Sequence, residues 1–164
     1  MAGETEEALF QICSVTENTL RREGYEPNAK GYKAWLLDNT PIITGVSFGC
    51  ALAEMSFGGS PDQSVKPVPL QHLLYKLVRC GLYHQGQMES DITFTENTLV
   101  GGPPHGVPKS FVIGLIFAVV ASPCNSGGQT KPGFFFSSGV EKLRPQDWWG
   151  RRDELLSKLR SLGV

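Results

Sequence analysis

Arg79 and His84 are the two residues whose types and spacing could carry chemistry, because only four residues separate a permanent cation from an imidazole. A histidine, with a reference pKa of about 6.5, can take up and return a proton near neutral pH. An arginine stays charged and can hold two oxygens of one phosphate. The pair therefore offers groups suited to cleaving RNA by attack of the 2′-hydroxyl on the phosphate, and neither role needs a metal.

The segment that carries this pair, residues 68–85, predicts a helix. Its apolar positions follow the spacing of one helical face: Leu70, Leu73, Leu74, Leu77 and Gly81. Gly86 is the expected end of the helix. Five residues of regular helix leave two side chains about 140° apart, so Arg79 and His84 would not share a face. They converge if the helix ends or distorts at 81–86, or if two copies meet across a twofold axis.

The stretch LYKLVRCGLYHQG at 74–86 resembles the R-x4-6-H signature of HEPN domains and is similar to bacterial members of that family. HEPN domains are all-helical and often dimeric, and many are metal-independent endoribonucleases of toxin–antitoxin, defence or RNA-processing systems. The resemblance implies that Arg79 and His84 are catalytic and that two motifs of a homodimer line one cleft. It also implies RNA as a substrate, with an antitoxin or another protein as a further partner.

Three residues near the pair are expected to contact the substrate. Cys80 follows the motif arginine at a position that is usually polar in active members of the family, and a thiol forms weaker hydrogen bonds to a phosphate. Tyr83 could stack on a base. His72, seven residues before Arg79, lies on nearly the same helical face. Core packing of Tyr83 and a solvated His72 are the alternatives.

The pair itself has plainer alternatives. His84 could only cap the end of its helix, where the helix dipole favours a cation. Arg79 could be a surface arginine that pairs with Glu89 or Asp91. The alternative function is a non-catalytic HEPN-like helical module that binds RNA or a protein partner, and Cys80 is the residue that favours it.

Two other motifs could carry function. The string GVSFG at 45–49 resembles a nucleophile elbow with Ser47 at its centre, but an elbow needs a preceding strand. Pro41 and an apolar helical stretch stand there instead and argue against an elbow, so an esterase that uses Ser47 is only the third alternative. A cluster of basic and aromatic residues near the C-terminal end could grip single-stranded RNA: Arg144, Trp148, Trp149, Arg151 and Arg152. We favour an ordinary amphipathic helix with its tryptophans packed on the core.

No metal and no cofactor are expected. The cysteines at 13, 50, 80 and 124 are too widely spaced for the close pairs of a structural zinc site. No Walker string and no dinucleotide-binding fingerprint occurs in the sequence. We expect free thiols in a reducing cytoplasm.

Length and composition suit one helical domain spanning 1–164. The chain of 164 residues has a net charge of -1 and 40% hydrophobic residues. A pI of about 6.3 excludes an overall basic surface for nucleic acid, although not a local patch. The longest apolar run, 111–121, is shorter than the roughly 20 residues of a membrane span. The acidic N-terminal segment lacks the features of a secretory signal, so we expect no membrane association and a cytoplasmic location.

The pattern of apolar residues predicts a mainly α fold, a HEPN-like helical bundle with a small β-hairpin insertion. Helices are expected at 5–22 (ending at Gly24), 32–39, 41–57, 110–121 and 147–162. In the last of these, Arg151 and Arg152 are expected to face solvent. A strand is expected at 91–98 with 134–136 as its hairpin partner, and loops at 57–64, 101–108 (with His105) and 125–133.

Overall fold

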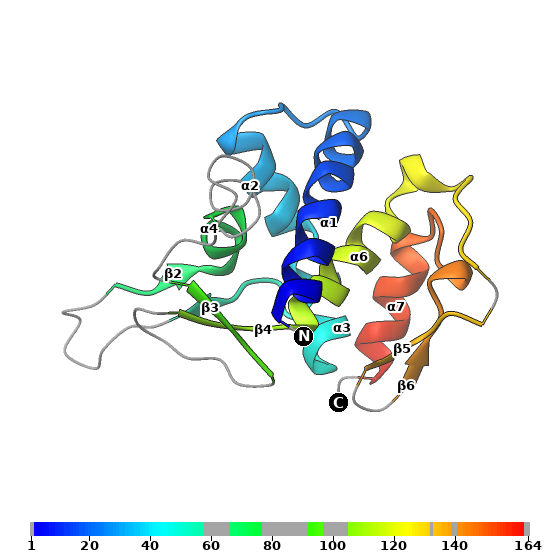
Figure 1. Ribbon diagram of the computed structural model, residues 1–164. Helices are drawn as coiled ribbons and strands as arrows, with labels where there is room; N and C mark the ends of the chain where they lie inside the picture. The colour runs from blue at the N-terminus through cyan, green and yellow to red at the C-terminus, as the bar shows by residue number, and fades with distance from the viewer. Residues whose placement is uncertain are drawn as a thin grey trace.

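The computed structural model describes residues 2–57, 66–76, 92–96, 105–131, 133–138 and 141–162. Over these residues the fold is mainly helical (Figure 1). The helices are α1 (Ala2–Arg22), α2 (Ala29–Asp38), α3 (Thr40–Phe48), α4 (Leu70–Tyr75), α6 (Ser110–Ala121) and α7 (Arg152–Leu162). Two short 3-10 turns accompany them, η2 (Pro123–Asn125) and η3 (Pro145–Asp147).

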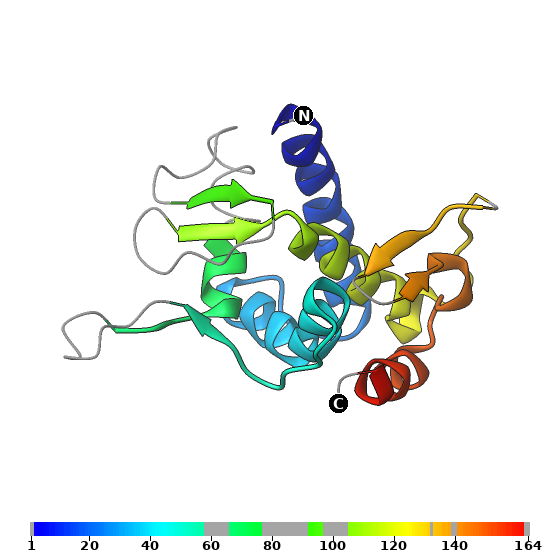
Figure 2. The ribbon, with the colours of Figure 1, turned by 90° about the horizontal axis from the view of Figure 1, so that it is seen from below.

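The small β component is confirmed, but the strands of the described residues form three separate pairs rather than the one predicted hairpin. β1 (Ser56–Phe57) pairs antiparallel with β2 (Val68–Pro69), and β5 (Phe136–Ser138) pairs antiparallel with β6 (Glu141–Leu143). β3 (Ile92–Thr95) pairs in parallel with β4 (His105–Pro108). The β3–β4 pair and the β5–β6 hairpin lie on different sides of the helical body (Figure 2).

β4 contradicts the loop expected at 101–108, and it also replaces 134–136 as the partner of the predicted strand. The glycines and prolines of that segment are typical of a loop, so its composition does not predict the short strand. Val107 is fully buried, and the amide of Lys109 extends the pairing by donating to the carbonyl of Thr95 at 2.9 Å. His105, expected in a loop, is thus part of the β4 backbone.

Helix α6 is the centre of the core and confirms the helix predicted at 110–121. It packs along α3 and also contacts α1 and α7. Most of its residues are buried because neighbours cover it on several sides, which explains why it is apolar almost all round. Gly114 allows the close approach to α3, since a Cβ there would lie 2.6 Å from the carbonyl oxygen of Ile43.

The breaks between the first three helices fall close to where the sequence predicts them. Gly24 follows α1 with a φ of 86°, a conformation that favours glycine. The side chain of Asn28 caps α2 by accepting from the amide of Gly31 at 3.0 Å, and Pro41 stands in the first turn of α3. α3, however, ends at Phe48 rather than near 57, because Gly49 adopts a left-handed φ of 78°.

Helix α7 begins at Arg152, five residues later than predicted. Pro145 opens the turn η3 instead, and Gly150 has a left-handed φ of 71° just before the helix. Leu155 and Leu159 are buried as predicted. Arg152 does not face solvent: its side chain is 20% exposed and binds Glu23. Among the described residues, no helix has the length and apolar character needed to cross a bilayer.

Candidate functional site

The predicted catalytic residues Arg79 and His84 lie outside the described residues, as do Cys80 and Tyr83. The structure does describe α4, the helix that leads toward them. α4 begins at Leu70 rather than 68, because Val68 and Pro69 pair with β1 as strand β2. The predicted leucine face is confirmed over this length, with Leu70, Leu73 and Leu74 all buried.

Helix α4 is held against α2. The ring of Tyr75 meets the ring of Tyr32 edge to face, with 5.7 Å between centroids, and Lys33 lies 5.1 Å from the centroid of Tyr75. His72 is exposed on α4, on a different face from the buried leucines. His72 is therefore accessible to solvent, which both a solvated side chain and a contact with substrate require.

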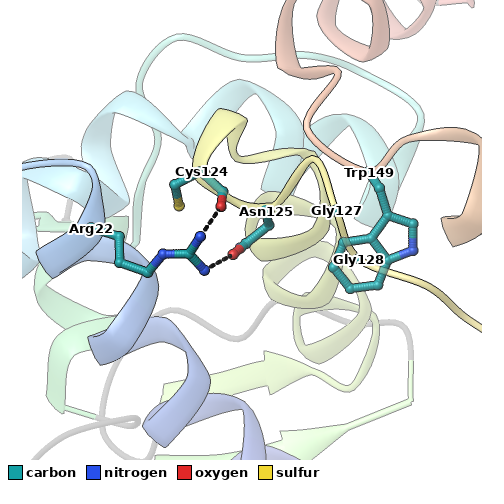
Figure 3. A pocket seen from close by; sticks show the side chains of 6 residues that line it. All are labelled: Arg22, Cys124, Asn125, Gly127, Gly128 and Trp149. Carbon is teal, nitrogen blue, oxygen red and sulfur yellow. Dashed lines mark hydrogen bonds between the residues drawn. The ribbon is translucent and has the colours of Figure 1, made fainter.

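A cavity of about 370 Å³ is lined by residues of α1, of η2 and of the segment before α7, and α7 lies across α1 and α6 from α4 (Figure 1). Six residues line it: Arg22, Cys124, Asn125, Gly127, Gly128 and Trp149 (Figure 3). We refer to it as the Arg22 pocket. Its lining combines the last residue of α1, the turn η2, the loop after that turn and the segment before α7.

Arg22 is fixed in the Arg22 pocket by neutral oxygens alone. Its guanidinium donates to the side-chain oxygen of Asn125 at 2.9 Å and to the carbonyl oxygen of Cys124 (Figure 3). Three other arginines bind carboxylates instead: Arg21 binds Glu17, Arg151 binds Glu154 and Arg152 binds Glu23. Among the described residues, no carboxylate forms an ion pair with Arg22, so its charge is not neutralised by a direct partner.

Asn125 is held in place by the ends of two helices. Its amide nitrogen donates to the hydroxyl of Thr19 at 3.1 Å and to the carbonyl of Val119 at 2.8 Å. These bonds leave the amide oxygen directed toward Arg22. The position of the guanidinium therefore depends on the packing of α1 against α6.

Cys124 is a poor nucleophile. Its thiol lies 3.8 Å from the carbonyl oxygen of Thr19, to which it donates. Burial, and secondarily the negative charge of Glu23, raise the pKa of Cys124. The thiol therefore stays protonated at neutral pH, and its nucleophilic form is scarce.

Trp149 forms one wall of the Arg22 pocket because residue 128 is a glycine. A Cβ on Gly128 would lie 2.0, 2.3 and 2.4 Å from three adjacent atoms of the six-membered indole ring. These distances place Gly128 over the face of the ring. If the Cβ approached the middle atom from the ring edge, the two flanking atoms would be much farther from it than they are. The indole nitrogen of Trp149 lies 3.5 Å from the hydroxyl of Thr130, to which it donates.

The basic and aromatic cluster near the C-terminal end, the less favoured interpretation of that segment, does not present all its arginines to solvent. Arg152 binds Glu23 and the hydroxyl of Ser122, and its side chain is only 20% exposed. Arg151 pairs with Glu154 and lies 5.9 Å from the ring centroid of Trp148. Sequence reasoning missed the Arg22 pocket because its two main parts, Arg22 and residues 124–128, are far apart in the chain. The polar, glycine-containing run after Pro123 is the signal that could have pointed to it.

Ser47 is a helical residue of α3, so the strand that a nucleophile elbow requires is absent before it. Its hydroxyl donates to the carbonyl of Ser110 at 3.1 Å. This bond joins α3 to the start of α6. The position is structural, and the esterase alternative is not supported.

Among the described residues, no disulfide joins the three cysteines Cys13, Cys50 and Cys124. Burial raises the pKa of Cys13 to about 12. Within the described ranges, no three histidine, cysteine or acidic side chains are grouped so that they could hold a metal ion.

A family model with the description Rv1289 matches residues 2–161 of the chain. No curated protein matches the chain, and no solved structure does.

Proposed function

Since the chain belongs to the Rv1289 family, a membership that assigns no chemistry, we propose its function from its own residues. It is a metal-independent endoribonuclease of the HEPN type that acts through Arg79 and His84 at a cleft between two protomers. The observation that carries this proposal is the Arg79-x4-His84 motif. Arg79 stands three positions after Lys76, the residue at which the described part of this segment ends.

The structure of α4 supports the proposal in two ways. Its buried leucines and its contact with α2 anchor the helix, and precise catalytic groups need such a rigid support. His72 is exposed on this helix. An exposed imidazole on the helix that leads toward the motif is accessible to a nucleic acid.

The reaction follows from the chemistry of the two groups. His84 removes the proton of the 2′-hydroxyl, and the 2′-oxygen attacks the adjacent phosphorus. Arg79 holds the non-bridging oxygens and stabilises the charge that accumulates on them. The bond from phosphorus to the 5′-oxygen breaks as protonated His84 donates a proton to that oxygen. The products are a 2′,3′-cyclic phosphate and a free 5′-hydroxyl.

The test is incubation of the purified protein with mixed RNA in EDTA. We expect cleavage that leaves cyclic phosphate ends, and its loss in the Arg79→Ala/His84→Ala variant. His105→Ala is the matched control, because it changes a histidine of β4 outside the motif. Circular dichroism would establish that each variant is folded. Equal cleavage by the double variant and the wild type would contradict the proposal.

Cys80 supports the second candidate, a non-catalytic HEPN-like module that binds RNA or a protein partner. A thiol replaces the polar side chain that is usual after the motif arginine in active members of the family. If the folded wild type binds RNA without cleaving it, this candidate holds. Cleavage by Cys80→Asn alone would then identify the thiol as the cause of inactivity.

A further inference from the structure

We propose that the Arg22 pocket binds a free nucleoside monophosphate, with the phosphate on Arg22 and the base against the indole of Trp149. None of the residues that line the pocket belongs to α4. The proposal is therefore independent of the ribonuclease proposed above. It requires no residue of the Arg79-x4-His84 motif.

The charge of Arg22 selects an anion. A guanidinium has five N–H groups, and Arg22 uses two of them on Asn125 and Cys124, which leaves three for a ligand. Both acceptors are neutral, so they orient the guanidinium without cancelling its charge. The adjacent carboxylate of Glu23 is bound by Arg152, which offsets its repulsion of an anion. Bidentate binding of a phosphate is the interaction that such a fixed, free guanidinium favours.

The glycines give a ligand room beside that charge. A Cβ on Gly127 would meet no atom within 4 Å, so the ligand can approach the backbone there. The volume of about 370 Å³ falls within the range of small-molecule sites, which is roughly 300–1,000 Å³. Inorganic phosphate alone would leave most of this space empty.

The indole of Trp149 selects the other half of the ligand. Gly128 supports one face of the ring, and the hydroxyl of Thr130 holds its nitrogen, so the ring is fixed before a ligand arrives. Trp149 is half-buried and lines the pocket. Aromatic side chains stack on nucleic acid bases of any sequence. A cation and an indole in one cavity therefore match a phosphate joined to a base.

The experiment is calorimetric titration of the full-length protein with AMP, adenosine and inorganic phosphate, each in EDTA. We expect AMP to bind at least tenfold more tightly than either fragment. In Arg22→Gln the affinity for AMP should fall at least tenfold, to that of adenosine, while adenosine binds as before. Arg21→Gln is the matched control, because the neighbouring Arg21 pairs with Glu17 outside the pocket.

Gly127→Leu separates binding from local unfolding, since it fills open space and leaves Arg22 and its partners in place. We expect it to abolish binding of AMP without lowering the unfolding temperature. The Arg79→Ala/His84→Ala variant should bind AMP like the wild type, whether or not the wild type cleaves RNA. Equal losses in Arg21→Gln and Arg22→Gln, unchanged binding in Gly127→Leu, or the absence of AMP binding would each overturn the proposal.

Discussion

Glu23 joins three parts of the chain through one carboxylate. It directly follows α1, accepts the indole N–H of Trp35 in α2 at 2.8 Å, and binds Arg152 of α7 at 2.6 Å. The side chain of Glu23 is 8% exposed. A charge this buried is tolerated because each of its partners donates a hydrogen bond to it.

Replacement of Glu23 by glutamine is expected to destabilise the protein by about 3 kcal/mol, because it leaves the charge of Arg152 largely buried without a counter-charge. The free energy of unfolding in urea at pH 7 measures this loss. Glu154→Gln is the control, since it removes an exposed ion pair with Arg151, and we expect it to leave the urea midpoint unchanged. Similar midpoints for both variants would contradict the role of Glu23.

Tyr25 should make stability depend on pH in the alkaline range. It donates a hydrogen bond to Asp38 at 2.5 Å, and burial together with this carboxylate raises its pKa to about 12. The unfolded chain ionises at a pKa of about 10, so ionisation favours unfolding between these two values. Relative to Tyr25→Phe, the wild type should keep its full advantage below pH 10 and lose it as the pH rises toward 12. Urea midpoints of both proteins across this range test the prediction, and a constant difference would contradict it.

The two proposed sites differ in how far single residues could be predicted. Only four residues separate Arg79 from His84, so the chemistry proposed for them is visible in the sequence. Arg22 meets its partners across 102 and 103 positions, and no local pattern encodes that meeting. The burial of Arg152 could not be predicted either, because its carboxylate partner Glu23 lies 129 positions away in the sequence.

At the level of elements, the approach of α6 to α3 depends on a missing side chain. Gly114 faces the backbone of Ile43 and the hydroxyl of Ser47, and a Cβ would lie 2.6 and 2.8 Å from their oxygens. Real Cβ atoms do not approach other atoms so closely. The two helices would have to separate to admit even a methyl group.

Gly114→Ala is therefore expected to lower the free energy of unfolding by about 2 kcal/mol through overpacking, despite the higher helix propensity of alanine. Gly127→Ala is the control, because its Cβ would meet nothing within 4 Å. We expect that control to change stability by less than about 0.5 kcal/mol. A stabilised Gly114→Ala variant would show that the helices have room for the methyl group.

The helices were predicted better than the strands for a physical reason. Helices α1, α2 and α6 were located by local signals. These signals are the spacing of apolar residues and the residues that end or start a helix, namely Gly24, Pro41 and Ser122–Pro123. Pairing of β3 with β4 is not local, because a strand of four residues carries no information about its partner. The start of α7 was missed since η3 and Gly150 interrupt an otherwise continuous amphipathic pattern.

For the whole molecule, the proposed ribonuclease requires two protomers. We expect the protein to sediment with twice its chain mass of 17.9 kDa. A refolded mixture of Arg79→Ala and His84→Ala should regain cleavage that neither variant shows alone, because a mixed dimer holds one intact Arg79 and one intact His84. A monomeric mass, or a mixture as inactive as its components, would contradict a shared cleft.

The ion pair between Glu23 and Arg152 also bears on the kinetics of folding. It closes a separation of 129 residues in a chain whose helices form from local contacts. Local helices form before such a distant pair, so its energy should be absent from the folding transition state. Loss of the pair in Glu23→Gln should then increase the unfolding rate constant and leave the refolding rate constant nearly unchanged. In a stopped-flow chevron plot, only the unfolding arm should be displaced. We therefore expect the pair to lengthen the lifetime of the native state and to have little influence on the folding rate.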